Sequence, residues 1–105
     1  MTQPEGIPED GTYSYDIAFA EWNGKTLGDK VNITISGDQI EVVYAEGNLS
    51  NTEPGYVFVK GVIKKHKSGA WIICETPDDI NASEVGGCVD GPYVIDFDKK
   101  LFWLC

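Results

Sequence analysis

Apolar and polar side chains alternate along most of the chain, and a period of two is typical of strands that bury one face. In the first such segment, Tyr13, Tyr15, Ile17 and Phe19 share one face. The apolar set then moves to even positions, which predicts a bulge or bend near Ala18–Ala20. Further strands, alternating or apolar on both faces, are predicted over residues 27–36, 40–44, 56–63, 70–75, 93–97 and 101–105.

Short turn signals join neighbouring strands, since Asn-Gly and Gly-Asp pairs suit two-residue hairpin loops. These signals occur at Asn23-Gly24, Gly37-Asp38, residues 64–69 and Lys99-Lys100. About seven short strands with tight turns predict an all-β fold, either a small antiparallel meander barrel with a lipocalin-like outline or a small sandwich. We favour the barrel because closure removes exposed edge strands. Gly61, inside a predicted strand, indicates a close approach of two backbones.

One segment breaks the alternation and carries the signals of a helix start. Thr76 suits the N-cap, Pro77 suits the first helical position, and the two aspartates that follow suit the positive end of the helix dipole. Gly86 suits the position just after the last turn. We therefore predict one short helix over residues 77–85, which could close one end of the barrel.

The length of 105 residues is that of one domain. Residues 1–10 hold two prolines, a glycine and three acidic residues, so we expect a flexible N-terminal arm followed by one barrel domain over residues 11–105. No apolar run reaches the ~20 residues needed to cross a bilayer, so we expect no membrane insertion. No signal peptide is visible at the start, and a secreted or periplasmic location stays open if a leader has been removed.

Net charge limits the partners that the chain can bind. The sequence has 17 acidic residues against 8 basic ones, a formal charge of −9, and every basic residue is a lysine. Contacts to phosphates need a basic surface and favour arginine, so we expect no nucleic-acid binding. A basic protein partner is compatible with this charge, because opposite fields steer encounter. Acidity that serves solubility alone is the other interpretation.

The sequence holds no recognisable catalytic motif. His66 is the only histidine, and it lies among Lys64, Lys65 and Lys67 without a carboxylate or nucleophile beside it. We expect His66 to be exposed to solvent on a hairpin tip. A glycine-rich phosphate loop and a Gly-x-Ser-x-Gly elbow are both missing. We therefore expect a protein that is not an enzyme, with no catalytic residue and no cofactor.

The three cysteines are Cys74, Cys88 and Cys105, and they lack the Cys-x-x-Cys spacing of zinc sites. The acidic run from Asp78 does not fit the register of a calcium-binding loop, so we expect no metal site. An odd count fits either three reduced thiols or one disulfide with one free cysteine. Cys74 and Cys105 each end a predicted strand and form the candidate disulfide, while Cys88 lies in a loop that could reach either.

Three tryptophans, five tyrosines and four phenylalanines are many rings for a domain of this size. Most must lie in the core, and an exposed cluster of the rest would mark a ligand cleft or a partner surface. The candidate ligand- or partner-binding residues are Trp22, Tyr44, Tyr56, Trp71 and Trp103. The candidate partner loop is Lys65, His66, Lys67 and Ser68 at the predicted hairpin tip.

The segment Ser68-Gly69-Ala70-Trp71, followed by Cys74 and a final Cys105, resembles part of a known family. It is similar to the Ser-Gly-x-x-Tyr segment and terminal cysteine of small bacterial lysozyme inhibitors of the membrane-bound, c-type-specific kind. The aromatic residue of this chain is Trp71 rather than a tyrosine, and the likeness covers only these positions. The resemblance implies a β-barrel that inserts a loop into the cleft of a basic enzyme.

Two interpretations of function follow from the sequence. The first is a non-enzymatic binding module, a small acidic barrel that holds a small apolar ligand or a protein partner. It depends on the number of aromatic residues and on the lack of catalytic motifs. The alternative is an acidic inhibitor or immunity-type protein that blocks a basic enzyme. The sequence gives neither the partner nor the oligomeric state.

Overall fold

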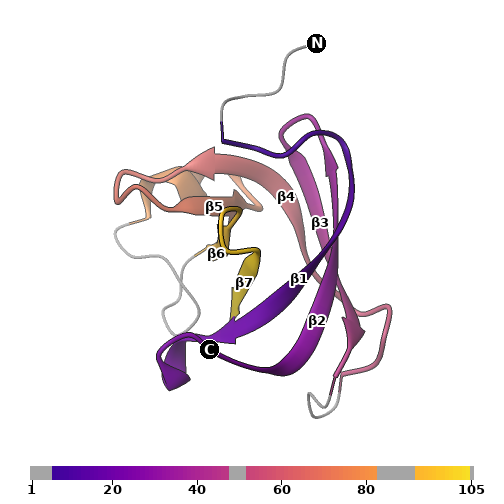
Figure 1. Cartoon of the computed structure of the whole chain (residues 1–105). Coiled ribbons are helices and arrows are strands. Elements are labelled where there is room, and N and C mark those ends of the chain that lie inside the picture. The colour runs from indigo at the N-terminus through magenta and orange to yellow at the C-terminus, as the bar shows by residue number, and fades with distance from the viewer. Residues whose placement is uncertain (1–5, 48–51, 83–91, 105) are drawn as a thin grey trace.

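The computed structural model describes residues 6–47, 52–82 and 92–104, which form a closed barrel of seven strands (Figure 1). Each strand pairs with the next one in chain order. The strands are β1 (Gly11–Phe19), β2 (Lys25–Ser36), β3 (Gln39–Glu46), β4 (Val57–Lys65), β5 (Trp71–Cys74), β6 (Tyr93–Asp96) and β7 (Leu101–Leu104). The predicted all-β barrel is confirmed.

A parallel pair closes the barrel, and this corrects the expectation of a purely antiparallel sheet. All consecutive strands are antiparallel, whereas β1 runs parallel to β7 from the Asp16–Leu101 pair to the Phe19–Leu104 pair. In an up-and-down meander with an odd number of strands, the first and last strands run in the same direction. Closure of seven strands therefore requires one parallel pair, and the sheet is mixed.

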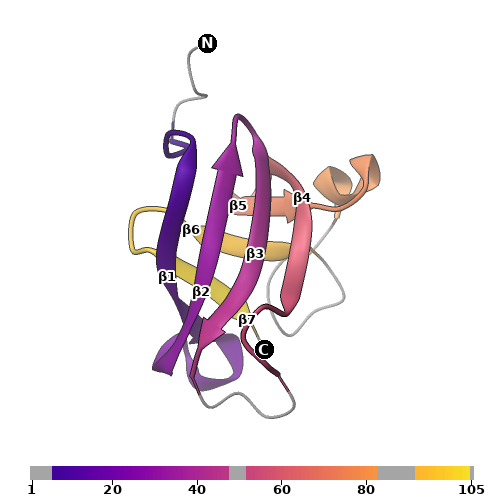
Figure 2. The same ribbon diagram turned by 90° about the vertical axis from the view of Figure 1, so that its right-hand side faces the viewer.

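The barrel has one wall of long strands and one wall of short strands. Strands β1 to β4 contain 9, 12, 8 and 9 residues, whereas β5, β6 and β7 contain 4 each. Figure 2 shows the long strands standing side by side, with the short strands crossing behind them. The turns at the ends of the short strands carry the candidate site described below.

Irregular pairing bends the long strands around the core. Between the pairs Asp16–Lys30 and Ala18–Thr26, β1 advances two residues while β2 advances four. Further irregularities interrupt the pairing of β2 with β3 and of β3 with β4. Extra residues of this kind increase the local twist and turn a strand. The bend predicted near Ala18–Ala20 therefore lies slightly earlier in β1, and its extra residues belong to β2.

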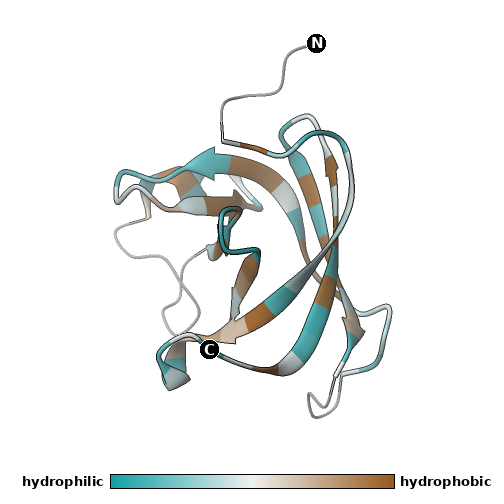
Figure 3. Cartoon of the chain, in the orientation of Figure 1, coloured by the Kyte–Doolittle hydropathy of each residue, from teal (hydrophilic) through white to brown (hydrophobic). Residues whose placement is uncertain are grey.

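Rings and branched aliphatic side chains fill the centre of the barrel. Figure 3 shows hydrophobic and hydrophilic residues alternating along the long strands. Phe102 is fully buried, and its ring centroid lies 5.8 Å from that of Phe58 and 5.4 Å from that of Tyr93. Burying one such large apolar side chain contributes about 1.5–3 kcal/mol. The largest fully buried side chains are Tyr44, Phe102, Ile17, Ile33, Ile35, Ile40, Ile72, Ile73, Ile95, Val31 and Val42.

One polar pair lies inside this core. The Tyr44 hydroxyl donates a hydrogen bond of 3.0 Å to Oδ1 of Asp29, and both side chains are buried. Asp29 belongs to the extra residues of β2 that have no partner opposite in β1, so the local bend turns its carboxylate inward. Gly47 packs directly on Asp29, where any Cβ would overlap the carboxylate. This pair satisfies a phenol that could not otherwise be buried without cost.

The predicted helix over residues 77–85 is wrong in type and length. A 3-10 turn spans Pro77–Asn81, and Ala82 already has extended backbone angles. Oδ2 of Asp79 accepts hydrogen bonds from the backbone N–H of Glu75 and of Thr76, which fixes the first turn. The turn lies outside the wall next to β5, so it closes no end of the barrel (Figure 2). Residues 83–85 and Gly86 lie outside the described residues.

Part of the expected N-terminal arm packs against the barrel. Ile7 is buried within the hydrophobic core, and the Tyr13 hydroxyl donates a hydrogen bond of 2.5 Å to the Glu9 carbonyl. Gly6 has a φ of +92°, and a Cβ at that position would lie 2.7 Å from the Trp71 ring. Residues 1–5 lie outside the described part. Within the described ranges, no helix combines the length and apolar character of a membrane span.

The close backbone approach predicted at Gly61 is present between β4 and β5. A Cβ at Gly61 would overlap the carbonyl oxygen of Cys74 and lie 2.9 Å from its carbonyl carbon. These are backbone atoms of a paired strand, so they cannot rotate away as a side chain could. The β4–β5 pairing therefore depends on the absence of a side chain at this position.

We predict that Gly61→Ala lowers the free energy of unfolding by at least about 2 kcal/mol, because overpacking against fixed backbone separates the two strands. Urea unfolding followed by tryptophan fluorescence measures the change. Lys60→Ala, at the exposed neighbouring position, should stay within about 0.5 kcal/mol of the parent protein. Equal stabilities for Gly61→Ala and Lys60→Ala would contradict this account of Gly61.

Candidate functional site

An open cleft of about 800 Å³ lies between the β4–β5 hairpin and the β6–β7 turn. The last regular pair between β5 and β6 at this end is Trp71 with Ile95. Beyond this pair the two turns separate, and Ala70 and Phe97 line opposite sides of the opening. The cleft results from the short strands, whose pairing ends before their turns meet.

Trp71 forms the centre of the aromatic lining. Its ring centroid lies 5.9 Å from that of Phe97, and Gly6 packs on its other side. The Lys65 Nζ lies 4.7 Å from the Trp71 ring centroid, within the range of a cation–π contact. Both residues line the cleft, together with Phe97 and Gly6. Contacts from three separate segments therefore fix the orientation of the indole.

Trp103 supplies a second indole to the cleft from β7. It packs on Gly24 in the turn before β2, where a Cβ would lie 2.6 Å from the ring. The neighbouring side chain in β7, Phe102, points into the core and is fully buried. Because successive side chains of a strand point to opposite faces, Trp103 is held on the outer face of the sheet.

The β6–β7 turn is held by Asp96. Oδ1 of Asp96 accepts hydrogen bonds of 3.0 Å from the Asp98 N–H and 2.9 Å from the Lys99 N–H. Lys100 completes the turn with a φ of +59°. The carboxylate of Asp98 stays exposed at the edge of the cleft. One aspartate thus shapes the turn, and the other is left for contacts outside it.

These aspartates also act on the barrel interior. Burial raises the pKa of Tyr15 above its ordinary value, and the negative charges of Tyr13, Asp96 and Asp98 raise it further. The Tyr15 ring lies 6.4 Å from that of Phe97, which joins the inner rings to the cleft lining. The cleft is therefore electrostatically coupled to the core beneath it.

The structure corrects the expected exposure of His66. The side chain is 3% exposed, and both ring nitrogens are engaged. Nδ1 accepts a hydrogen bond from the Ser68 N–H at 3.2 Å and lies 2.8 Å from the Ser68 hydroxyl. Nε2 lies 2.6 Å from the Ala82 carbonyl and donates to it in the neutral tautomer that these contacts favour. His66 joins the β4–β5 hairpin to the segment that follows the 3-10 turn.

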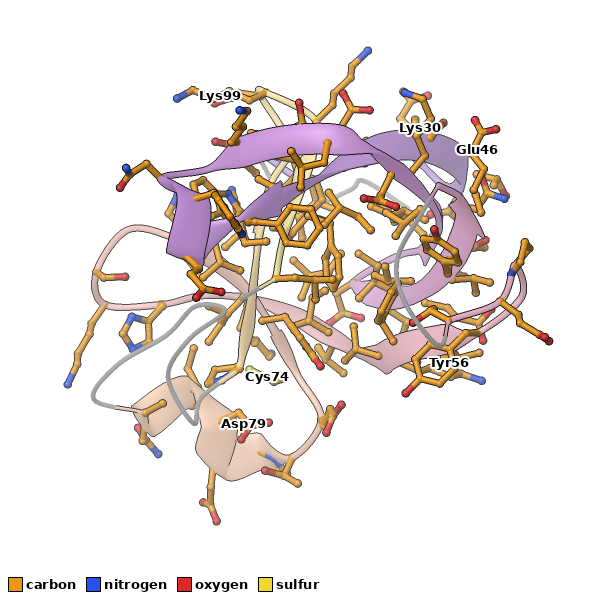
Figure 4. All side chains as sticks on the ribbon, turned by 90° about the horizontal axis from the view of Figure 1, so that it is seen from below. Lys30, Glu46, Tyr56, Cys74, Asp79 and Lys99 are labelled. Carbon is orange, nitrogen blue, oxygen red and sulfur yellow. The ribbon has the colours of Figure 1, made fainter. Side chains whose placement is uncertain are left out.

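The five predicted binding aromatics do not form one site. Trp71 and Trp103 both line the cleft. Tyr44 is a core residue, 2% exposed, and does not line the cleft. Trp22 and Tyr56 are more than half exposed but lie outside the cleft lining, and Figure 4 shows Tyr56 projecting from the edge of the barrel.

In the candidate partner loop, Lys65 reaches the cleft, while His66 and Ser68 bond to each other inside the hairpin. Phe97 and Asp98 also line the cleft, and neither was among the predicted binding residues. The signal that could have identified them is their place at the start of the turn before Lys99-Lys100. A turn between two four-residue strands is where lining residues of a small barrel concentrate.

The expected disulfide between Cys74 and Cys105 is not formed. Cys74 is a buried free thiol. Cys88 and Cys105 are outside the described residues. Burial raises the pKa of the Cys74 thiol, and the nearby Asp79 carboxylate raises it further, while Lys64 opposes this effect. Figure 4 shows Cys74 beside the turn that carries Asp79. A protonated, buried thiol is chemically inert.

Lysines are concentrated beside the cleft although the chain is acidic overall. Five of the eight basic residues lie in the two segments that border it. They are Lys64, Lys65, Lys67, Lys99 and Lys100. The remaining lysines lie on β2 and β4. The cleft therefore combines aromatic surface, two lining aspartates and a border of positive charge.

The described part of the chain contains no group of three His, Cys, Asp or Glu side chains placed to hold a metal ion. Comparisons with protein-family models, curated proteins and solved structures find no match for this chain. The arrangement of the cleft itself is consequently the basis for any functional assignment. Aromatic rings with a few charged groups at the edges are suited to holding a ligand.

We predict that His66→Ala lowers the free energy of unfolding by about 2–3 kcal/mol, because it removes two hydrogen bonds and leaves the partner groups unpaired. Denaturant unfolding measures the loss, and hydrogen exchange should show faster exchange of the Ser68 amide. Lys67→Ala, in the same hairpin, is the control and should change stability by less than about 0.5 kcal/mol. An unchanged stability for His66→Ala would show that the contacts to Ser68 and Ala82 do not hold the hairpin.

We also predict that stability falls as pH rises above about 9. Burial is the first cause of the raised pKa of Cys74, Tyr15 and Tyr93. A raised folded-state pKa gives stability that is complete below the unfolded value and is lost as pH rises through the folded value. The ordinary values are 9.0 for the thiol and 10.0 for the phenols, which set the start of the window.

Urea unfolding at pH 7, 8.5, 9.5 and 10.5 tests this dependence. Cys74→Ala is the control variant, because it removes the thiol and keeps both phenols. Its stability should fall less than that of the parent protein at each step above pH 8.5, because the thiol contribution is lost from its ordinary value of 9.0 up through the raised folded value. A stability that stays constant or increases up to pH 10.5 would refute the assignment.

Proposed function

We propose that the protein is a non-enzymatic binding module that takes a small ligand with an apolar body in the cleft between the β4–β5 hairpin and the β6–β7 turn. The observation that carries the proposal is the convergence of Trp71, Phe97 and Trp103 on one open cleft of about 800 Å³. Pockets of roughly 300–1,000 Å³ lined by rings and a few polar groups are typical of small-molecule sites.

The filled interior supports a site at the edge rather than inside the barrel. A lipocalin-like carrier would hold its ligand in the centre, where this chain places Phe102, Ile17 and Ile95 with almost no exposed surface. Displacing such side chains would cost their packing energy, which is about 1.5–3 kcal/mol for each. The cleft needs no such rearrangement, because it is already open.

The chemistry of the cleft supports binding rather than catalysis. A general base or nucleophile needs a partner within hydrogen-bond reach and a suitable pKa. His66 uses both ring nitrogens inside the hairpin, and Asp96 uses its carboxylate to hold the turn. The remaining lining groups, Lys65 and Asp98, suit recognition of charge at the two sides of the cleft.

The alternative function, an inhibitor that inserts a loop into a basic enzyme, receives less support from the geometry. The hairpin that would be inserted carries Lys64, Lys65 and Lys67. These like charges would oppose entry into a basic cleft. An acidic face elsewhere on the chain would be needed for that function, and the aromatic cleft would then have no part in it.

The proposal predicts that indole, a small aromatic probe, binds in the cleft in the millimolar range. Titration followed by ¹⁵N-resolved NMR should shift the backbone amides of Gly69, Ala70 and Phe97 and the indole N–H signals of Trp71 and Trp103. Trp103→Ala should weaken binding at least about threefold, since an indole ring is a large share of the apolar lining. Trp22→Ala, which removes an exposed tryptophan outside the cleft, should bind as the parent does.

A second variant guards against unfolding of Trp103→Ala. Ala70→Leu places a larger side chain in the cleft and removes no core contact. It should also weaken binding of indole, because less space is left for the ligand. Shifts confined to the Trp22 and Tyr56 regions, or binding unchanged in both cleft variants, would refute the proposed site. No shift at indole concentrations up to its solubility limit would refute the binding function of the cleft.

A further inference from the structure

Two side chains of opposite charge line the cleft without neutralising each other. Lys65 lies at the end of β4, and Asp98 lies in the β6–β7 turn on the other side of the opening. Among the described residues, the one ion pair within 4.0 Å joins Lys30 to Asp16, on the long-strand wall. The cleft therefore offers a cation and an anion at separate positions.

The Lys65 ammonium retains its capacity to bind an anion. Its contact within the described residues is the face of the Trp71 ring, 4.7 Å from Nζ to the centroid. An ammonium has three N–H donors, and a ring face satisfies them only weakly. The contact nevertheless places the charge over the cleft lining rather than in open solvent. Lys65 is thus oriented and still able to donate.

The two lining aspartates differ in what they can still bind. Asp96 accepts two backbone N–H groups and shapes the turn. The Asp98 carboxylate has no hydrogen bond or ion pair within the described residues, and only its backbone N–H is engaged. A carboxylate accepts several hydrogen bonds when ionised. Asp98 is therefore the lining group that can receive a cation.

A ligand with a single charge fits this arrangement poorly. An anion at Lys65 would lie in the same cleft as Asp96 and Asp98, and a cation at Asp98 would share the cleft with Lys65. Like charges brought together oppose binding, and complementary charges at both positions favour it. A ligand that carries both charges meets an opposite charge at each side.

The lining between the two charges is aromatic. Trp71 and Phe97 lie 5.9 Å apart between centroids, at an interplanar angle of 59°, and Trp103 borders the same space. Rings in this arrangement bury an apolar or aromatic group with a favourable contribution beyond area alone. The cleft volume of about 800 Å³ is ample for a molecule the size of an amino acid.

We propose that the ligand of this cleft is a small zwitterion with an apolar or aromatic body, the chemical class of free amino acids. Its carboxylate binds the Lys65 ammonium, its ammonium binds the Asp98 carboxylate, and its body packs on Trp71, Phe97 and Trp103. This inference rests on the proposed binding function of the cleft and adds the charge pattern of the ligand.

Three probes that share a phenylethyl body test the charge pattern: L-phenylalanine, 3-phenylpropionate and 2-phenylethylamine. Isothermal titration of the full chain at low ionic strength measures each affinity, because exposed charge pairs are screened by salt. We expect phenylalanine to bind at least about fivefold more tightly than either singly charged probe.

Two variants assign each charge to its side chain. Lys65→Met should weaken binding of phenylalanine and phenylpropionate about threefold to tenfold and leave phenylethylamine unaffected or tighter. Asp98→Asn should weaken phenylalanine and phenylethylamine by a similar factor and spare phenylpropionate. Lys60→Met and Asp38→Asn remove charges outside the cleft lining and serve as matched controls. Urea unfolding of each variant verifies that the fold is retained.

The outcomes separate this inference from the proposed function. Equal affinities for the three probes, with shifts in the cleft, would overturn the zwitterion and leave the cleft a binding site. An affinity for one singly charged probe that equals the affinity for phenylalanine would overturn it as well. The zwitterion would also be overturned if the control variants Lys60→Met and Asp38→Asn lost as much affinity as Lys65→Met and Asp98→Asn. Absence of binding by all three probes and by indole would refute both proposals together.

Discussion

Closure between β1 and β7 is the contact on which the rest of the structure depends. Only four residue pairs form it, from Asp16 with Leu101 to Phe19 with Leu104. Without this pairing, β1 and β7 would each present an unpaired edge, and Phe102 would lose the neighbouring strand β1. The parallel direction is a consequence of the strand number, because seven alternating strands cannot end antiparallel to their start.

The closure also explains why the two walls differ. β1 pairs with β2 along nearly its whole length but pairs with β7 only from Asp16 to Phe19, the part of the strand that contains the irregularity near Ile17. This irregularity and those in the β2–β3 and β3–β4 pairings curve the sheet of long strands. The curved sheet can then pair with the three four-residue strands. The short strands run out before their turns, and the turns separate to leave the cleft. The candidate site is thus a geometric result of closing unequal walls.

Much of this fold was predictable, because its signals are local. Alternation identified the strands, Asn23-Gly24 and Gly37-Asp38 identified tight turns, and Gly61 indicated a close approach that the backbone requires. Each of these depends on residues within one strand or turn. The site was predictable only in part. Trp71, Trp103 and Lys65 were among the predicted residues, but the predicted aromatic set, which also contained Tyr44, does not form one cluster.

The errors have different physical causes, a contact between distant segments at His66 and local contacts at Asp79. Lysines on both sides of His66 predict exposure to solvent. The ring is instead buried, and its Nε2 bonds to the carbonyl oxygen of Ala82, 16 residues away. The signals at Thr76 and Pro77 did mark the start of a turn, but Asp79 folds back on the N–H groups of Glu75 and Thr76, and the chain leaves the helix after Asn81. The pattern at Thr76 and Pro77 identified where this segment begins but not that it ends after Asn81.

The charge of the whole chain is a poor guide to the charge at the cleft. A formal charge of −9 suggests an acidic surface that seeks a basic partner. The two segments beside the cleft, the end of β4 with its hairpin turn and the β6–β7 turn, instead carry five of the eight lysines. Asp96 uses its carboxylate to hold the turn, and the Asp98 carboxylate stays exposed at the edge of the cleft. If the cleft binds a ligand as we propose, a few oriented charges beside aromatic rings govern its recognition, because the field of distant exposed charges falls off within about 10 Å at ordinary salt.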